Sequence, residues 1–253
     1  INTSETEPEP EPEPETEPEP EPEPLNFSLN LVNHGSFALG LEIQDAKNFI
    51  ENFILGGESS IYNLYTDPID IYELTLEEGV LGAADYANRV IIINNTNNTI
   101  QVDYYLNDVS QTINLIVMIH EILHIVGIGT DQPGWYDNIT NYFYNGVNGF
   151  REYKTMLGNI NFDTSNLIGI PIEDNFGAGT VLSHFEEGVD EIDIQYRFDV
   201  SGVYHPTFPR EIMSGFINSG ANYLSRMTLG VLEDIGFFVN YNSENIMDAT
   251  FTV

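Results

Sequence analysis

The clearest chemical signal in the sequence is a pair of histidines four residues apart, with a glutamate directly after the first. These residues are His120, Glu121 and His124. Side chains four residues apart lie on one face of a helix, so both imidazoles can reach one metal ion. Glu121 is turned about 100° around the helix from His120, which suits a base rather than a third ligand. Either histidine alone is typical of a structural residue, whereas the whole HExxH pattern favours zinc with a general base.

A buried helix is predicted to carry this motif, because apolar residues lie on every side of the segment from Ile113 to Val126. Asp108 and Gln111 have the spacing of a capping box at the start of the helix, and Gly127 and Gly129 can turn the chain out at its end. The few polar groups of such a helix need partners inside the fold. The sequence has no uninterrupted apolar run of about 18 residues, so we expect no transmembrane segment.

The local sequence does not define a third zinc ligand. In the compact pattern HExxHxxGxxH this ligand would be residue 130, where the chain has Thr130, a poor ligand for zinc. The chain contains no cysteine, so the ligand must be a histidine or a carboxylate. The candidates are His34, His184, His205, Asp131 and Glu152. Glu152 would complete a His-His-Glu set, while the position of His34 before the sheet is typical of a surface or turn residue.

Four ordered blocks of the sequence resemble the leishmanolysin family of metallopeptidases: HEILHIVGIG, YNGVNGFREY, IPIEDNFGAGTVLSHFEE and EIMSGFINSGANYLSRMTLGVLEDIGF. The resemblance covers about residues 110–240. In that family an insertion separates the glycine of HExxHxxG from the third histidine. The resemblance implies zinc ligands at His120, His124 and His184 and a catalytic base at Glu121. It also implies that Met213, which alone would be read as a core residue, forms the Met-turn that lies under the zinc site in metzincins.

Two features depart from the family pattern. The protozoan members are rich in disulfides, and this cysteine-free chain is more similar to the cysteine-poor bacterial members. The acidic stretch at residues 186–204 is also longer than the family pattern leads us to expect. An inserted hairpin or a calcium-binding loop would explain this stretch. Its length also leaves His205 as a rival of His184 for the third ligand position.

The predicted fold is α+β, and the resemblance implies a metzincin-like zincin arrangement. The N-terminal catalytic lobe, residues 25–129, should contain a twisted mixed sheet and two helices, one of which carries HExxH. The strands are expected at Leu25–Leu31, Ile69–Leu76, Val90–Ile93 and Ile100–Leu106, and the other helix at Gln44–Leu55. The C-terminal catalytic lobe, residues 130–253, should be irregular. It should contain the Met-turn, a short helix at Gly149–Leu157 and a C-terminal helix at Leu224–Ile235.

Two segments of the predicted sheet are expected at its centre and at its edge. The apolar run Val90–Ile93 is typical of a central strand that is covered on both faces. The small residues before it, which include Gly82 and Ala83, could offer an edge strand to an extended peptide substrate. A plain turn explains these small residues equally well.

Composition limits the partners of the chain. Its 253 residues include 40 acidic and 7 basic ones, with a formal net charge of -33. Because this charge repels phosphate groups, we expect no nucleic-acid or anionic-membrane partner. A soluble surface explains the acidity, as do a saline habitat, bound calcium or cationic substrates. Residues 1–24 are predicted to be a disordered Glu-Pro spacer.

The sequence therefore predicts a zinc metalloendopeptidase with one catalytic Zn2+, protein or peptide substrates, and Ca2+ as a candidate second ion. We expect a monomer that is secreted or displayed at a cell surface. The chain begins at Ile1 rather than Met, and we expect a processed product without its signal segment. The alternative is a catalytically silent adhesin or binding module with a structural zinc. Glu121 favours the enzyme, because a structural zinc site needs no base.

Overall fold

The computed structural model describes residues 27–58, 67–100, 103–130, 134–175, 177, 179–187, 196–243 and 246. The predicted Glu-Pro spacer, residues 1–24, lies outside these residues. Within them, helices and several small sheets form a mixed α+β fold, as predicted. The four α-helices of this described part are α1 (Phe37–Phe53), α3 (Ile113–Ile125), α4 (Val147–Asn159) and α5 (Arg226–Ile235).

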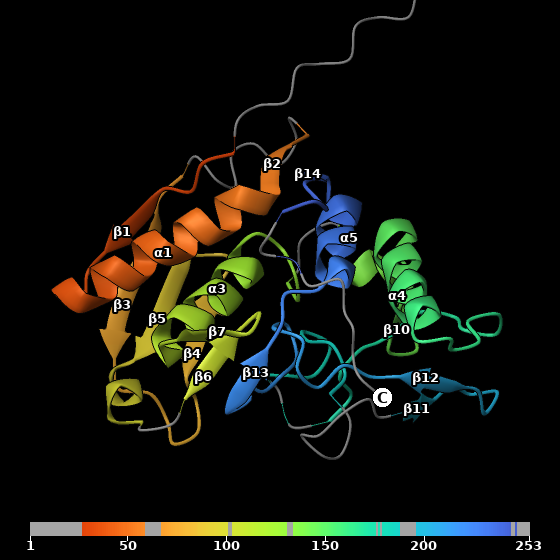
Figure 1. Cartoon of the computed structure of the whole chain (residues 1–253). Helices are drawn as coiled ribbons and strands as arrows, with labels where there is room; N and C mark the ends of the chain where they lie inside the picture. The colour runs from red at the N-terminus through yellow and green to blue at the C-terminus, as the bar shows by residue number, and fades with distance from the viewer. Residues whose placement is uncertain are drawn as a thin grey trace, which may run out of the picture.

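The largest sheet has four strands in the order β1-β3-β5-β4. Their bounds are β1 (Leu31–Asn33), β3 (Ile69–Leu74), β4 (Gly82–Asp85) and β5 (Val90–Asn94). Strands β1, β3 and β5 run parallel, and β4 runs antiparallel to β5 at the edge of the sheet. The internal position of β5 is therefore as predicted, but its residues alternate between buried and half-buried, so the predicted cover on both faces is wrong. Of the two interpretations of the small residues before β5, the structure shows the edge strand, β4. Figure 1 shows α1 and α3 lying across one face of this sheet.

Two further sheets join the N-terminal and C-terminal parts of the chain. Strand β13 (Gly220–Asn222) pairs in parallel with β6 (Tyr104–Leu106), which also forms a hairpin with β7 (Val109–Gln111). Strand β14 (Phe237–Val239) pairs antiparallel with β2 (Ile54–Gly57). Because these two pairings cross the boundary placed after residue 129, the two predicted lobes share hydrogen-bonded sheets.

Helix α3 is buried along its whole length, so the prediction of a helix without a solvent-exposed face is confirmed. The predicted capping box, however, is wrong. Asn107 and Asp108 have φ angles of 49° and 63° and form the tight turn between β6 and β7, so Asp108 lies before the helix and does not cap it. The cap is Thr112, whose hydroxyl group accepts a hydrogen bond from the backbone N–H of Leu115 at 3.2 Å.

Two other elements of the N-terminal part begin elsewhere than predicted. Helix α1 begins well before Gln44, because the Ser36 hydroxyl caps it by accepting a hydrogen bond from Leu39 N at 3.2 Å. Strand β1 begins at Leu31, where the alternating pattern predicted that a strand from Leu25 would end. The alternating apolar side chains that are described before β1 are buried. The pattern therefore identified the buried positions correctly and the hydrogen-bonded strand incorrectly.

The C-terminal part consists mainly of short elements. Strands β8 (Ile139–Thr140), β9 (Phe143–Tyr144) and β10 (Ile170–Pro171) form a small antiparallel sheet. Strands β11 (Tyr196–Phe198) and β12 (Tyr204–Pro206) form an antiparallel hairpin at the end of the acidic stretch, one of the two explanations proposed for its length. Helices α4 and α5, both at predicted positions, pack against each other, as Figure 1 shows.

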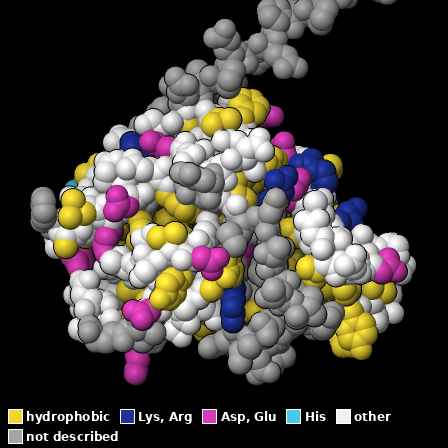
Figure 2. Space-filling view, in the orientation of Figure 1, with side chains coloured by type: hydrophobic (Ala, Val, Ile, Leu, Met, Phe, Trp, Pro, Cys, Tyr) yellow, Lys and Arg dark blue, Asp and Glu magenta, His cyan; other side chains and the backbone are white. Residues whose placement is uncertain are grey.

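Acidic side chains are more common than basic ones on the face of the molecule drawn in Figure 2. The face shown in Figure 2 has Asp and Glu side chains scattered over it and only a few Lys and Arg side chains. This distribution agrees with the net charge of -33. Among the helices described, none has both the length and the apolar character that a membrane crossing requires.

Candidate metal centre

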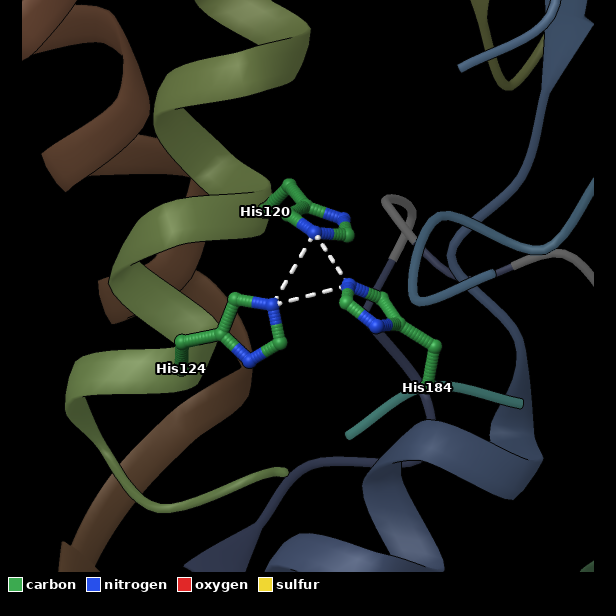
Figure 3. A group of neighbouring side chains, drawn as sticks. All are labelled: His120, His124 and His184. Carbon is green, nitrogen blue, oxygen red and sulfur yellow. Dashed lines mark hydrogen bonds between the residues drawn. The ribbon is translucent and has the colours of Figure 1, made fainter. Parts of the chain in front are cut away.

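Three histidine side chains converge, although they come from two distant parts of the chain. His120 and His124 lie one turn apart on α3, and His184 lies in the segment that follows β10. The Nε2 atoms of His120 and His124 are 3.0 Å apart, and the Nε2 atom of His184 is 3.1 Å from each of them. All three side chains are buried and point toward one another (Figure 3). The structure thus brings together the three histidines that the resemblance implied.

The chain that leaves α3 packs directly against the segment that carries His184. Gly129 turns the chain with a φ of 74°, and a Cβ atom there would lie 2.1 Å from the Ser183 carbonyl oxygen. Only glycine permits both this conformation and this approach. The indole N–H of Trp135 donates a hydrogen bond to the Leu182 carbonyl at 2.8 Å. These contacts hold the two residues before His184 against the chain that follows the HExxH helix.

Each imidazole is oriented by a backbone carbonyl group. The Nδ1 atoms of His120, His124 and His184 contact, in that order, Ile212 O at 2.6 Å, Ile128 O at 2.8 Å and Thr180 O at 3.2 Å. A carbonyl oxygen can only accept a hydrogen bond, so each Nδ1 carries the hydrogen and each Nε2 keeps a lone pair. Partners of this kind fix the tautomer and the ring orientation of metal-binding histidines.

The three Nε2 lone pairs face one another and need a positive charge between them. Burial lowers the pKa of His120 to about 3 and that of His124 to about 4. Burial also lowers the pKa of His184 well below its usual value. The three rings are therefore neutral at physiological pH. No proton shared between two Nε2 atoms then explains why these atoms lie so close together. A metal ion would accept all three lone pairs, so the residues present fit a metal site.

The other candidate ligands lie elsewhere and have partners of their own. His34 is exposed, and its Nε2 atom lies 2.7 Å from an aspartate on β3. His205 is fully buried, with its Nε2 atom 3.4 Å from Asp199. Glu152 forms ion pairs with two arginines at 2.9 and 2.8 Å. Asp131 lies outside the described residues. Of the described candidates, only His184 joins the HExxH pair.

Glu121 is buried, and its side chain lies against β4. A Cβ atom at Gly82 would lie 2.8 Å from Glu121 Oε1 and 2.5 Å from Val117 Cγ1. Glycine therefore allows β4 to approach α3 at the position of the glutamate. Burial raises the pKa of the Glu121 carboxyl group to about 8. An edge strand thus lies against the buried carboxyl group of Glu121, the residue that follows His120 on α3.

Met213 lies in a buried turn that is hydrogen-bonded to the histidine cluster. The residue before it, Ile212, provides the carbonyl group that His120 contacts. Glu211 Oε2 accepts a hydrogen bond from Met213 N at 2.5 Å. Glu211 Oε1 accepts hydrogen bonds from Ser225 N at 3.2 Å and from the Ser225 hydroxyl at 3.0 Å. The segment predicted as a Met-turn is therefore a turn, and a buried glutamate connects it to the start of α5.

The sequence does not reveal the groups that orient the histidines or hold the turn around Met213. Three of them are the backbone carbonyls of Ile128, Thr180 and Ile212, and no residue type marks a carbonyl for this role. The fourth, Glu211, occurs within one of the quoted blocks, where an acidic residue directly before apolar Ile212 and Met213 is the only sequence signal of a buried acceptor. Its side-chain partners, Ser225 and Thr228, lie 14 and 17 residues away, so local spacing does not reveal them.

Comparisons with models of protein families, with curated proteins and with solved structures found no match for this chain. The geometry of the three histidines and Glu121 therefore carries the functional conclusion.

Proposed function

We propose that this chain is a zinc-dependent endopeptidase, with His120, His124 and His184 as the zinc ligands. The observation that carries the proposal is that the Nε2 lone pairs of the three histidines converge. In each ring, Nδ1–H donates a hydrogen bond to a backbone carbonyl group, which leaves the lone pair on Nε2. Three imidazoles without a thiolate are a donor set typical of catalytic zinc. The resemblance to leishmanolysin-like metzincins supports the same assignment.

Glu121 is the proposed general base. A bound zinc ion would lower the pKa of a water molecule and polarise the carbonyl group of a peptide bond. Glu121 would take the proton of the attacking water and deliver it to the leaving amine nitrogen. Its burial supports this role, because a carboxylate in a dry site has a raised affinity for protons. The three histidines stay neutral and serve as ligands, so Glu121 is the acid–base group of the cluster.

The edge of β4 is the proposed binding site for the peptide substrate. Asn94 N donates a hydrogen bond to Leu81 O at 3.0 Å. Because hydrogen-bonded pairs alternate in an antiparallel ladder, Ala83 bonds to β5, while Gly82 and Ala84 direct their backbone groups away from it. An extended peptide could pair with these outward groups. The closeness of Gly82 to Glu121 would bring the scissile bond beside the base.

The second candidate function is a binding module or adhesin in which zinc is structural. A structural site usually closes its fourth position with a protein ligand. In the described part of the chain, the metal-ligand cluster at this place consists of the three histidines alone. This open donor set and the adjacent Glu121 favour the enzyme. Secretion or surface display is compatible with either function.

The test is digestion of casein by the zinc-loaded chain and by Glu121→Gln, with zinc content measured in both. We expect one zinc in each protein and a loss of proteolysis of at least about 100-fold in the variant, because the general base is removed. Glu78→Gln, at an exposed position, is the matched control and should keep full activity. Full activity of Glu121→Gln would refute the proposed base, and digestion by the metal-free wild type would refute the zinc mechanism.

A further inference from the structure

Two buried carboxyl groups lie at the ends of the segment that carries His184. Glu173 is 0% exposed and Glu187 is 6% exposed. One oxygen of each has a backbone partner: Glu173 Oε1 accepts a hydrogen bond from Asn175 N at 2.7 Å, and Glu187 Oε2 accepts one from Gly215 N at 3.0 Å. The second bond connects the end of the His184 segment to the turn that contains Met213.

The other oxygen of each carboxyl group is buried, and no N–H or O–H group of the described residues donates a hydrogen bond to it. These atoms are Glu173 Oε2 and Glu187 Oε1. The two carboxyl groups lie within hydrogen-bonding reach of each other. Burial, and then the charge of Glu173, raise the pKa of Glu187 to about 8. Two buried carboxylates that face each other repel strongly unless a proton or a cation lies between them.

Two more acidic groups lie beside Glu173. Glu173, Asp174 and Glu186 each offer a carboxylate oxygen, and these oxygens lie within 4.8 Å of one another. Arg197 offsets part of their charge, with its guanidinium 2.6 Å from Asp174 and 3.0 Å from Glu186. Four carboxylates and one guanidinium still leave an excess of negative charge. The two unpartnered oxygens belong to the glutamates that Arg197 does not contact in these ion pairs.

We propose that Glu173 and Glu187 bind a calcium ion, with the carboxylates of Asp174 and Glu186 beside them. Calcium prefers oxygen ligands and accepts carboxylates in flexible arrangements of about 6–8 oxygens. The unpartnered oxygens are the ligands that such a site requires, whereas the three-imidazole cluster suits a softer ion. The site is separate from the histidine cluster, and its existence does not depend on the proposed proteolysis.

A calcium ion at this position would stabilise the loop that positions the third histidine. Glu173 and Glu187 lie on either side of His184 in the chain, and the Thr180 carbonyl that orients His184 lies between them. Glu187 also reaches Gly215, two residues after Met213. An ion between the two glutamates would therefore close the loop and hold it against the turn.

The test is calorimetric titration of the full chain with calcium after the protein has been loaded with one equivalent of zinc. We expect one saturable calcium site in the wild type and at least tenfold weaker binding in the double variant Glu173→Gln/Glu187→Gln. The matched control, Glu77→Gln/Glu78→Gln, removes the same charge from an exposed turn and should bind calcium like the wild type. Equal affinity in all three proteins, or no saturable binding by the wild type at millimolar calcium, would overturn the proposal.

A second measurement does not depend on the folding of the double variant. Millimolar calcium should raise the Tm of the zinc-loaded wild type more than the same concentration of magnesium, which gives up its water ligands reluctantly. An equal response to both ions would mean that a shared proton, rather than calcium, bridges the glutamates. A chain that binds calcium but does not digest casein would remove the proposed function and leave this site in place.

Discussion

The two regions that supply the histidines are stabilised in different ways. His120 and His124 lie on α3, whose residues are all buried among apolar side chains and whose position is set by its packing against α1 and the sheet. His184 lies in a segment between short strands, which is held by single backbone hydrogen bonds, such as Phe185 N to Met213 O at 2.9 Å, and by bonds to buried carboxylates. The first region positions its ligands by a regular helix, and the second by isolated backbone bridges and individual polar groups.

The C-terminal part repeatedly uses buried or half-buried acids as acceptors of backbone hydrogen bonds. Asp234 on α5 accepts hydrogen bonds from Asn148 N at 2.8 Å and Gly149 N at 2.9 Å, so it caps α4 from a neighbouring helix. Glu211 and Glu187 bind backbone N–H groups of the turn that contains Met213. A carboxylate that accepts backbone hydrogen bonds can replace a helix cap or a strand ladder. Asp234, Glu211 and Glu187 therefore have a structural role.

The largest expected effect comes from removing the ligand that the C-terminal region supplies. His184→Ala should weaken zinc binding by more than about 100-fold, since even the loss of an outer partner of a ligand costs about 10–100-fold. Zinc affinity can be measured by competition with a chromophoric chelator. His34→Ala, which removes an exposed histidine, should leave the affinity unchanged. An unchanged affinity in His184→Ala would mean that the third ligand lies elsewhere.

A smaller effect, on stability, is expected from removing Glu211, the buried acceptor that connects the Met213 turn to α5. Glu211→Ala should reduce the free energy of unfolding by about 3 kcal/mol, because several buried donors lose their charged partner. Thr112→Ala, which removes the cap of α3, should cost only about 1 kcal/mol. Urea unfolding of the two variants and the wild type measures both effects. If the two substitutions reduced the free energy of unfolding equally, the proposed difference in how the two regions are stabilised would be wrong.

The smallest effect on stability is expected from Asp199 in the β11–β12 hairpin, and this effect depends on pH. Asp199 Oδ1 accepts hydrogen bonds from Val203 N at 2.9 Å and Ser201 N at 2.7 Å, and the bond from Val203 is the main reason why the pKa of Asp199 is lowered. The unfolded chain then binds a proton more readily than the folded one, so stability is lost as pH falls through the lowered pKa.

Asp199→Asn tests this dependence. The wild type should be the more stable protein at about pH 6, and its advantage should shrink as pH falls below the ordinary aspartate pKa of 3.8. The difference in urea midpoint between the two proteins, measured across this range, gives the result. A difference that grows toward low pH would contradict the assigned role of the charged carboxylate.

Sequence patterns predicted the regular region better than the irregular one. The apolar run around HExxH predicted a buried helix, and the short apolar run at β5 predicted an internal strand. Both predictions rest on patterns of neighbouring residues, which are visible in the local sequence. The cap at Thr112 was missed because Asp108 and Gln111 offered a competing pattern, and the tight turn at Asn107 overrode it.

The third ligand lies 60 residues beyond His124, and no local spacing connects the two residues. Only the resemblance singled out His184 from its rivals. The paired glutamates at 173 and 187 could not be predicted either, because they become neighbours only when the segment between them folds back. Sequence thus indicates elements with a regular period, whereas contacts made by single polar side chains appear only in the structure.

X-ray absorption at the zinc edge tests the central claim most directly, because it reports the atoms bound to zinc. For the zinc-loaded chain we predict three imidazole nitrogens and one oxygen at about 2 Å, with the oxygen supplied by water. His184→Ala should show one imidazole fewer. A spectrum with two imidazoles in the wild type, or with the fourth position filled by a protein side chain, would contradict the proposed catalytic site.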